Sequence, residues 1–77
     1  MWFYKSAVGL MQITENTTGG YTLCIGDTIL DRTYRTHIAA VIDVRDFLTG
    51  CIEWDSLKGT IQPPVDISDW TYGHANY

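Results

Sequence analysis

The sequence is poor in cysteine and has no long hydrophobic run. Its 77 residues include only Cys24 and Cys51, too few for the disulfide framework of many small secreted domains. No apolar stretch approaches the roughly 20 residues of a membrane-spanning helix. The first residues also lack the basic and apolar regions of a secretory signal. These absences predict a cytoplasmic protein that does not enter a membrane.

Positive charge is also scarce. The chain has five Lys and Arg residues against nine Asp and Glu residues, for a net charge of −4. Because binding to phosphates needs clustered Lys and Arg, direct nucleic-acid binding is not expected. All of the net negative charge lies in residues 43–77. This acidic half either faces a basic partner or serves only solubility.

Soft metal ligands are few and scattered. They are Cys24, His37, Cys51 and His74, and they lack the short paired spacing of a structural zinc site. No glycine-rich phosphate loop precedes the expected helix. The sequence therefore predicts no metal, no cofactor and no catalytic residue. Cys24 and Cys51 are expected to be core thiols.

Four short segments are expected to form strands: the first because it is aromatic, the second and third because they alternate, and the fourth with a less clear pattern. They are residues 1–5, 10–14, 21–25 and 28–34. The polar segment 15–20 ends in two glycines, which predicts an antiparallel hairpin between its flanking strands. Gly26-Asp27 is expected to form a second tight turn.

One helix is expected within residues 36–50. Thr36 is a good N-cap, residues 37–49 contain no Gly or Pro, and Gly50 is placed to end the helix. Residues 51–70 then close the domain, with Pro63-Pro64 forcing an extended path, and residues 71–77 resemble a frayed tail. The fold class is α+β: one domain with an antiparallel sheet of three to four strands, one helix on one face and an extended C-terminal segment.

The helix has more apolar residues than one face needs. At about 100° per residue, one arc holds the expected core residues Ala40, Val41, Val44, Phe47 and Leu48. A separate flank carries Ile38, Ile42 and Arg45. Either residues 60–70 cover this flank, or a partner does. Its polar rim is expected to contain Asp43, Asp46, Glu53 and Asp55.

The stretch TGCIEWDSLKG, residues 49–59, combines a thiol with two acids. Cys51 would follow a helix C-terminus, where the negative dipole raises a thiol pKa. Glu53 and Asp55 share a face if the chain is extended, and they are expected to be solvated. The stretch is therefore interpreted as a closing motif. The structural anchors of the domain are expected to be Trp2, Gly50, Trp54 and Trp70.

Two motifs carry a resemblance. Thr49, Gly50, Glu53, Trp54 and Asp55 form a TG-x-x-EWD element, and a P-x-D-[LI]-S-x-W element spans residues 64–70. The chain thereby resembles a group of small uncharacterised bacterial proteins with an aromatic first strand and an Ala-rich helix. The resemblance implies a shared fold, and it brings no activity that could be transferred.

These observations favour a small acidic, non-enzymatic protein-interaction module. In size and charge it is similar to phage or mobile-element accessory and inhibitor proteins, including anti-CRISPR proteins. The expected partner is another protein or a second copy in a weak homodimer. The alternative is a small hydrolase or metal-dependent enzyme that uses Cys51 or the Glu53/Asp55 pair.

Overall fold

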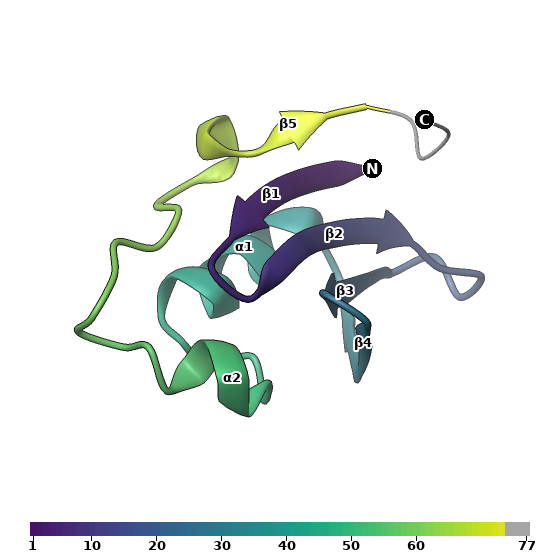
Figure 1. The fold of residues 1–77 in the computed structure, drawn as a ribbon. Helices are drawn as coiled ribbons and strands as arrows, with labels where there is room; N and C mark the ends of the chain where they lie inside the picture. Colours follow the sequence, from purple (N-terminus) through teal and green to yellow (C-terminus); the bar gives the residue numbers. More distant parts are fainter. Residues whose placement is uncertain (74–77) are drawn as a thin grey trace.

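A computed structural model describes residues 1–73, which form an antiparallel sheet with a helix packed on one face (Figure 1). The strand order is β4-β3-β2-β1-β5. The strands are β1 (Trp2–Ser6), β2 (Gly9–Glu15), β3 (Tyr21–Ile25), β4 (Thr28–Tyr34) and β5 (Thr71–Tyr72). The expected α+β class is confirmed, and the segments expected as strands correspond to β1, β2, β3 and β4, but the sheet has five strands where three to four were expected.

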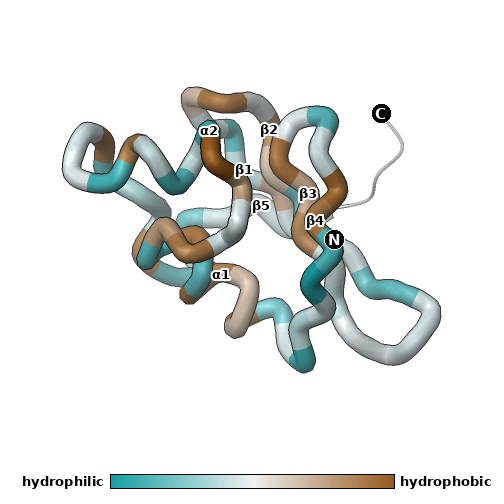
Figure 2. Tube along the Cα trace, turned by 90° about the horizontal axis from the view of Figure 1, so that it is seen from below, coloured by the Kyte–Doolittle hydropathy of each residue, from teal (hydrophilic) through white to brown (hydrophobic). Residues whose placement is uncertain are grey.

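The core forms where the alternating apolar residues of β2 and β3 meet α1 (His37–Arg45). Met11, Ile13 and Leu23 are fully inaccessible to solvent, and Ile25 nearly so. The register places Met11 beside Ile25 and Ile13 beside Leu23, so these side chains share one face. Figure 2 shows the hydrophobic residues concentrated along the strands and the hydrophilic ones mainly in the loops.

The hairpin between β2 and β3 depends on Asn16 and Gly20. The Asn16 side-chain oxygen accepts hydrogen bonds from the backbone N–H groups of Thr18 and Gly20, both at 3.0 Å. A Cβ atom at position 20 would lie 2.7 Å from the carbonyl oxygen of Tyr34. Glycine is therefore required there, because the loop passes against the end of β4.

The prediction of a frayed tail at residues 71–77 is wrong for residues 71 and 72. Thr71 and Tyr72 form β5, which pairs with Phe3 and Trp2 of β1. A capping box at Asp66 and Asp69 encloses the short 3₁₀ helix η1 (Ile67–Asp69) and turns the chain back toward the sheet. Residues 74–77 lie outside the described residues.

Helix α1 ends four residues earlier than expected. Thr36 caps its start as predicted, since its Oγ1 accepts from the N–H of Ala39 at 3.1 Å. The helix ends because Phe47 has a positive φ of 57°. The N–H of Leu48 then donates to Asp43 O at 2.9 Å, as in a Schellman cap, with phenylalanine where glycine is usual.

Gly50 therefore does not end the helix, contrary to expectation. The left-handed conformation costs about 1–2 kcal/mol for an L-residue such as Phe47. Burial offsets this cost: the Phe47 ring stacks on Trp54 with centroids 4.9 Å apart and planes 17° apart. Leu48, expected in the core, is instead 59% exposed.

A second helix that was not expected, α2 (Ile52–Asp55), follows directly. It brings Trp54 under α1, where the indole is fully buried and its Nε1–H donates to Val44 O at 3.0 Å. Trp54 thus joins α2 to α1, and its expected role as a structural anchor stays a prediction. The extended path assumed for Glu53 and Asp55 is wrong, because both lie on this helical turn.

The other two tryptophans have different environments. Trp2 is half-buried and stacks on His37 with ring centroids 4.1 Å apart and planes 4° apart. Trp70 is buried, and its ring lies 5.4 Å from that of Tyr4. Among the described residues, the buried Nε1–H of Trp70 has no acceptor.

None of the helices formed by residues 1–73 combines the length and apolar character needed to cross a bilayer.

Replacing each buried tryptophan by phenylalanine tests these two environments. We expect Trp54→Phe to lower the free energy of unfolding by about 1 kcal/mol more than Trp70→Phe, because only Trp54 loses a hydrogen bond. Chemical denaturation of both variants measures the difference. An equal or larger loss for Trp70→Phe would contradict the assignment of Trp54 as the main anchor.

Candidate functional site

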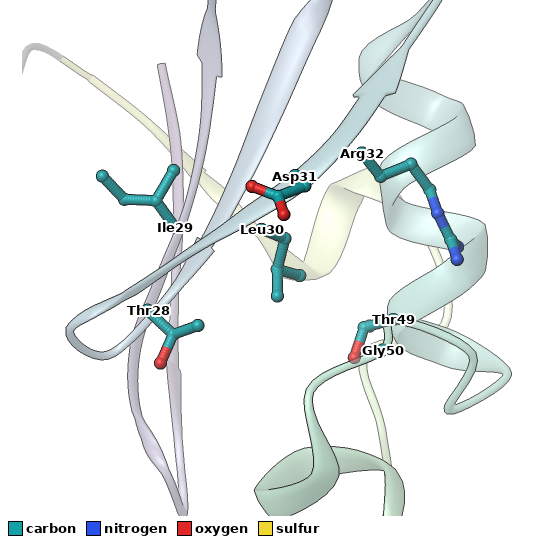
Figure 3. Close-up of a pocket in the computed structure, with 7 residues that line it drawn as sticks. All are labelled: Thr28, Ile29, Leu30, Asp31, Arg32, Thr49 and Gly50. Carbon is teal, nitrogen blue, oxygen red and sulfur yellow. The ribbon is translucent and has the colours of Figure 1, made fainter.

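The candidate site is a cavity between the edge strand β4 and the loop after α1. Its volume is about 560 Å³ (Figure 3). Its lining combines the first residues of β4 with two loop residues: Thr28, Ile29, Leu30, Asp31, Arg32, Thr49 and Gly50. Neither the cavity nor its polar surroundings were expected from the sequence.

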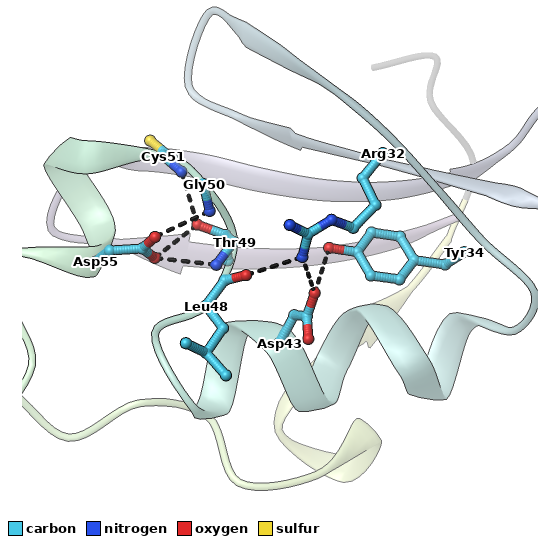
Figure 4. Close-up of polar contacts among 8 residues, drawn as sticks. All are labelled: Arg32, Tyr34, Asp43, Leu48, Thr49, Gly50, Cys51 and Asp55. Atoms are coloured by element: carbon cyan, nitrogen blue, oxygen red, sulfur yellow. Dashed lines mark hydrogen bonds and ion pairs between the residues drawn. The ribbon is translucent and has the colours of Figure 1, made fainter.

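Arg32 connects β4 to α1 and to the loop that follows α1. Its guanidinium binds the Asp43 carboxylate and donates to Leu48 O at 2.9 Å (Figure 4). The Tyr34 hydroxyl donates to the same Asp43 oxygen at 2.8 Å. Burial, followed by this contact with Asp43, raises the pKa of Tyr34 to about 12. Asp43 was expected on the polar rim of the helix flank, whereas its carboxylate faces β4.

Asp55 holds the loop from the other side. Its Oδ1 accepts from the N–H and the Oγ1–H of Thr49 at 3.1 and 2.7 Å, and its Oδ2 accepts from the Gly50 N–H at 2.9 Å (Figure 4). Thr49 is buried, and its Oγ1 also accepts from the Cys51 N–H at 3.1 Å. Asp55 is thus a half-buried structural group, and its expected role as a solvated acid is wrong.

The thiol of Cys51 is buried, and its pKa is raised. Burial raises its pKa, and the hydrogen bond that its Sγ donates to Glu53 Oε2 at 3.3 Å acts in the same direction. The expected direction is confirmed, but its cause is different. Cys51 precedes α2 instead of following a helix end.

The Cys51 thiol and the Glu53 carboxylate meet and line one hollow of about 330 Å³, but the Asp55 carboxylate does not join them. The Glu53 carboxylate accepts from Cys51, whereas the Asp55 carboxylate accepts from Thr49 and Gly50. Within residues 1–73, no three His, Cys, Asp or Glu side chains lie close enough together to hold a metal ion. His37 stacks on Trp2, and His74 lies outside the described residues.

The predicted helix flank is only partly covered. Ile38 and Ile42 are each 40% exposed. The Arg45 Nε lies 3.0 Å from Asp46 Oδ1, and both side chains are half-exposed. From residues 60–70, Ile61 and Ile67 pack against the core and leave the two flank isoleucines accessible.

An aromatic cluster near the sheet edge was also missed. Trp2 contacts His37 and Tyr72, and His37 contacts Tyr21, with ring centroids 4.1, 4.9 and 5.7 Å apart, respectively. These residues come from β1, α1, β5 and β3. No local spacing in the sequence could have indicated the cluster.

Comparison with protein-family models, with curated proteins and with solved structures gives no match. The resemblance based on the two sequence motifs therefore stays a prediction.

The role of Asp55 can be tested with a matched pair of variants. Asp55→Asn places an amide N–H₂ against the loop donors, so we expect the free energy of unfolding to fall by about 1–3 kcal/mol. Glu53→Gln, on the same helical turn but exposed, should change it by less than about 0.5 kcal/mol. Chemical denaturation measures both. Equal losses of stability in the two variants would contradict the structural role of Asp55.

The Tyr34 contact predicts alkaline instability. The folded state holds the pKa of Tyr34 at about 12, above its ordinary value of 10.0, so it favours the neutral phenol. The resulting stabilisation is complete below pH 10 and is lost as the pH rises toward 12. We expect the free energy of unfolding to fall more steeply over this range in the wild type than in Tyr34→Phe. If the free energy of unfolding falls equally steeply with pH in both proteins, the raised pKa does not belong to Tyr34.

Proposed function

We propose that this chain is a non-enzymatic protein-interaction module that binds a partner protein through the flank of α1 formed by Ile38, Ile42 and Arg45. The observation that carries the proposal is the pair of isoleucines, one helical turn apart and each 40% exposed. The core face of the same helix is already supplied by Ala40, Val41 and Val44, which are buried. The two isoleucines are not needed there.

Covering this flank would favour association. Full burial of an isoleucine side chain is worth about 1.5–3 kcal/mol, and a partner would cover the part of each chain that is still exposed. The neighbouring Arg45–Asp46 pair leaves the flank without a strong net charge. We therefore expect an apolar patch on the partner to contribute more to binding than charge complementarity does.

The polar rim of this surface is smaller than the sequence suggested. Asp43 and Asp55 accept hydrogen bonds inside the fold. Asp46 and Glu53 remain at the surface, Asp46 beside Arg45 and Glu53 exposed on α2.

The enzymatic alternative has less support. A thiol nucleophile needs a lowered pKa, whereas the pKa of Cys51 is raised. A carboxylate pair for acid–base work needs two groups that meet in one pocket, whereas Glu53 and Asp55 have separate partners. A small accessory or inhibitor protein, of the kind that phages and mobile elements carry, is the biological class we favour by size and charge.

Replacing Ile42 by glutamate tests the flank. We expect Ile42→Glu to remain folded, because the side chain is 40% exposed, and to lose a partner protein that the wild type captures from its native host. Ile52→Glu is the matched control, since Ile52 is 79% exposed but lies on α2. It should keep the same partner.

Two results would count against the proposal. If Ile42→Glu unfolds the isolated chain, as judged by circular dichroism, the flank contributes to the domain's own core. If the same protein is captured by Ile42→Glu and by the wild type, the flank is not the contact surface.

A further inference from the structure

The cavity of about 560 Å³ beside β4 follows the edge of the sheet. Its lining includes five consecutive residues of β4, residues 28–32. A cavity on one face of a strand is lined by alternate residues, because successive side chains point to opposite faces. The consecutive lining therefore places this cavity along the edge of β4, and Thr49 and Gly50 form its opposite wall. It is called here the edge groove.

The backbone of β4 is irregular at the edge groove. Because β4 is the last strand on its side of the sheet, no other strand within residues 1–73 pairs with its far edge. Ile29 lies opposite Cys24 and Thr33 opposite Thr22, so residues 30–32 oppose a single residue of β3. Such a bulge takes the extra residues out of the regular ladder. Their backbone N–H and C=O groups are then left to water or to a further strand.

The wall opposite β4 is held in place by hydrogen bonds. The N–H groups of Thr49 and Gly50 donate to the Asp55 carboxylate at 3.1 and 2.9 Å. Arg32 of β4 donates to Leu48 O, the residue before this wall, at 2.9 Å. Both sides of the edge groove are therefore fixed before a ligand arrives, which lowers the entropic cost of binding.

The side chains of the edge groove combine an apolar surface with one uncompensated charge. Leu30 is half-buried and lies between Thr28 and Thr49 (Figure 3). Asp31 is exposed and forms no ion pair with the other described residues. The charge of Arg32 is already paired with Asp43. The lining of the groove therefore carries a net negative charge beside an apolar side chain.

We propose that the edge groove binds a short extended segment of a partner protein, which adds as a further strand beside β4 and carries a basic residue next to an apolar one. In such strand addition, backbone hydrogen bonds supply affinity and alternate side chains supply specificity. Successive side chains of the segment point to opposite faces, so one packs against Leu30 while its neighbour faces Asp31. The segment is short because the bulge bends β4 at this point.

A capped pentapeptide with the order threonine, valine, lysine, valine, threonine is a suitable probe. We expect it to bind the full chain saturably in NMR titrations, with the shifted and more slowly exchanging amides in β4 and at residues 49–50. The same peptide with methylated backbone nitrogens keeps its side chains but has no N–H donors. It should bind at least tenfold more weakly, because strand addition depends on those donors.

The charge is tested with Asp31→Lys. This variant should stay folded by circular dichroism, because Asp31 is exposed. It should bind the lysine peptide several-fold more weakly, and it should bind a peptide with glutamate in place of lysine several-fold more tightly. Glu15→Lys is the matched control, since it makes the same change of charge at an exposed acid at the end of β2. It should leave both affinities unchanged.

Three results would overturn the proposal: no saturable binding of the lysine peptide, an affinity unchanged by methylation, or equal effects of Asp31→Lys and Glu15→Lys. A free chain whose β4 amides become protected as its concentration rises would also overturn it, because the edge would then belong to a second copy. None of these results depends on Ile42→Glu, so the edge groove and the helix flank can fail independently.

Discussion

The contact of Trp54 with Phe47 and Val44 holds α1, α2 and the intervening loop together. Phe47 has a backbone conformation that is unfavourable for its residue type, and stacking on the buried Trp54 indole offsets the cost. Since Phe47 ends α1, the next residues turn away from the helix. Leu48 O then accepts a hydrogen bond from Arg32. The backbone N–H groups of Thr49 and Gly50 donate to the Asp55 carboxylate. The polar contacts of the loop therefore depend on one aromatic pair.

The sequence was sufficient wherever burial or capping is local. Met11 with Ile13 and Leu23 with Ile25 alternate within their own strands, so their common face could be predicted without knowing what covers it. Thr36 could be assigned as an N-cap because its hydroxyl acts only three residues along the chain. For the same reason, the four main strands and the start of α1 were correctly placed.

The sequence was insufficient where residues distant along the chain decide the outcome. Gly50 is the strongest local stop signal, yet Phe47 ends α1 because Trp54, seven residues later, packs on its ring. The Arg32–Asp43 contact joins residues eleven positions apart on different elements. Strand β5 requires β1, from the other end of the chain. These features follow from tertiary packing, which propensities and caps do not encode.

The exposed helix flank follows from the architecture. Within residues 1–73, α1 covers one face of a single antiparallel sheet, and Ala40, Val41 and Val44 already supply its buried face. Ile38 and Ile42 lie beside that buried face, next to the Arg45–Asp46 ion pair, and each keeps 40% of its surface exposed. Association through this flank would also stabilise a small core, since a partner that binds only the folded state shifts the folding equilibrium toward it.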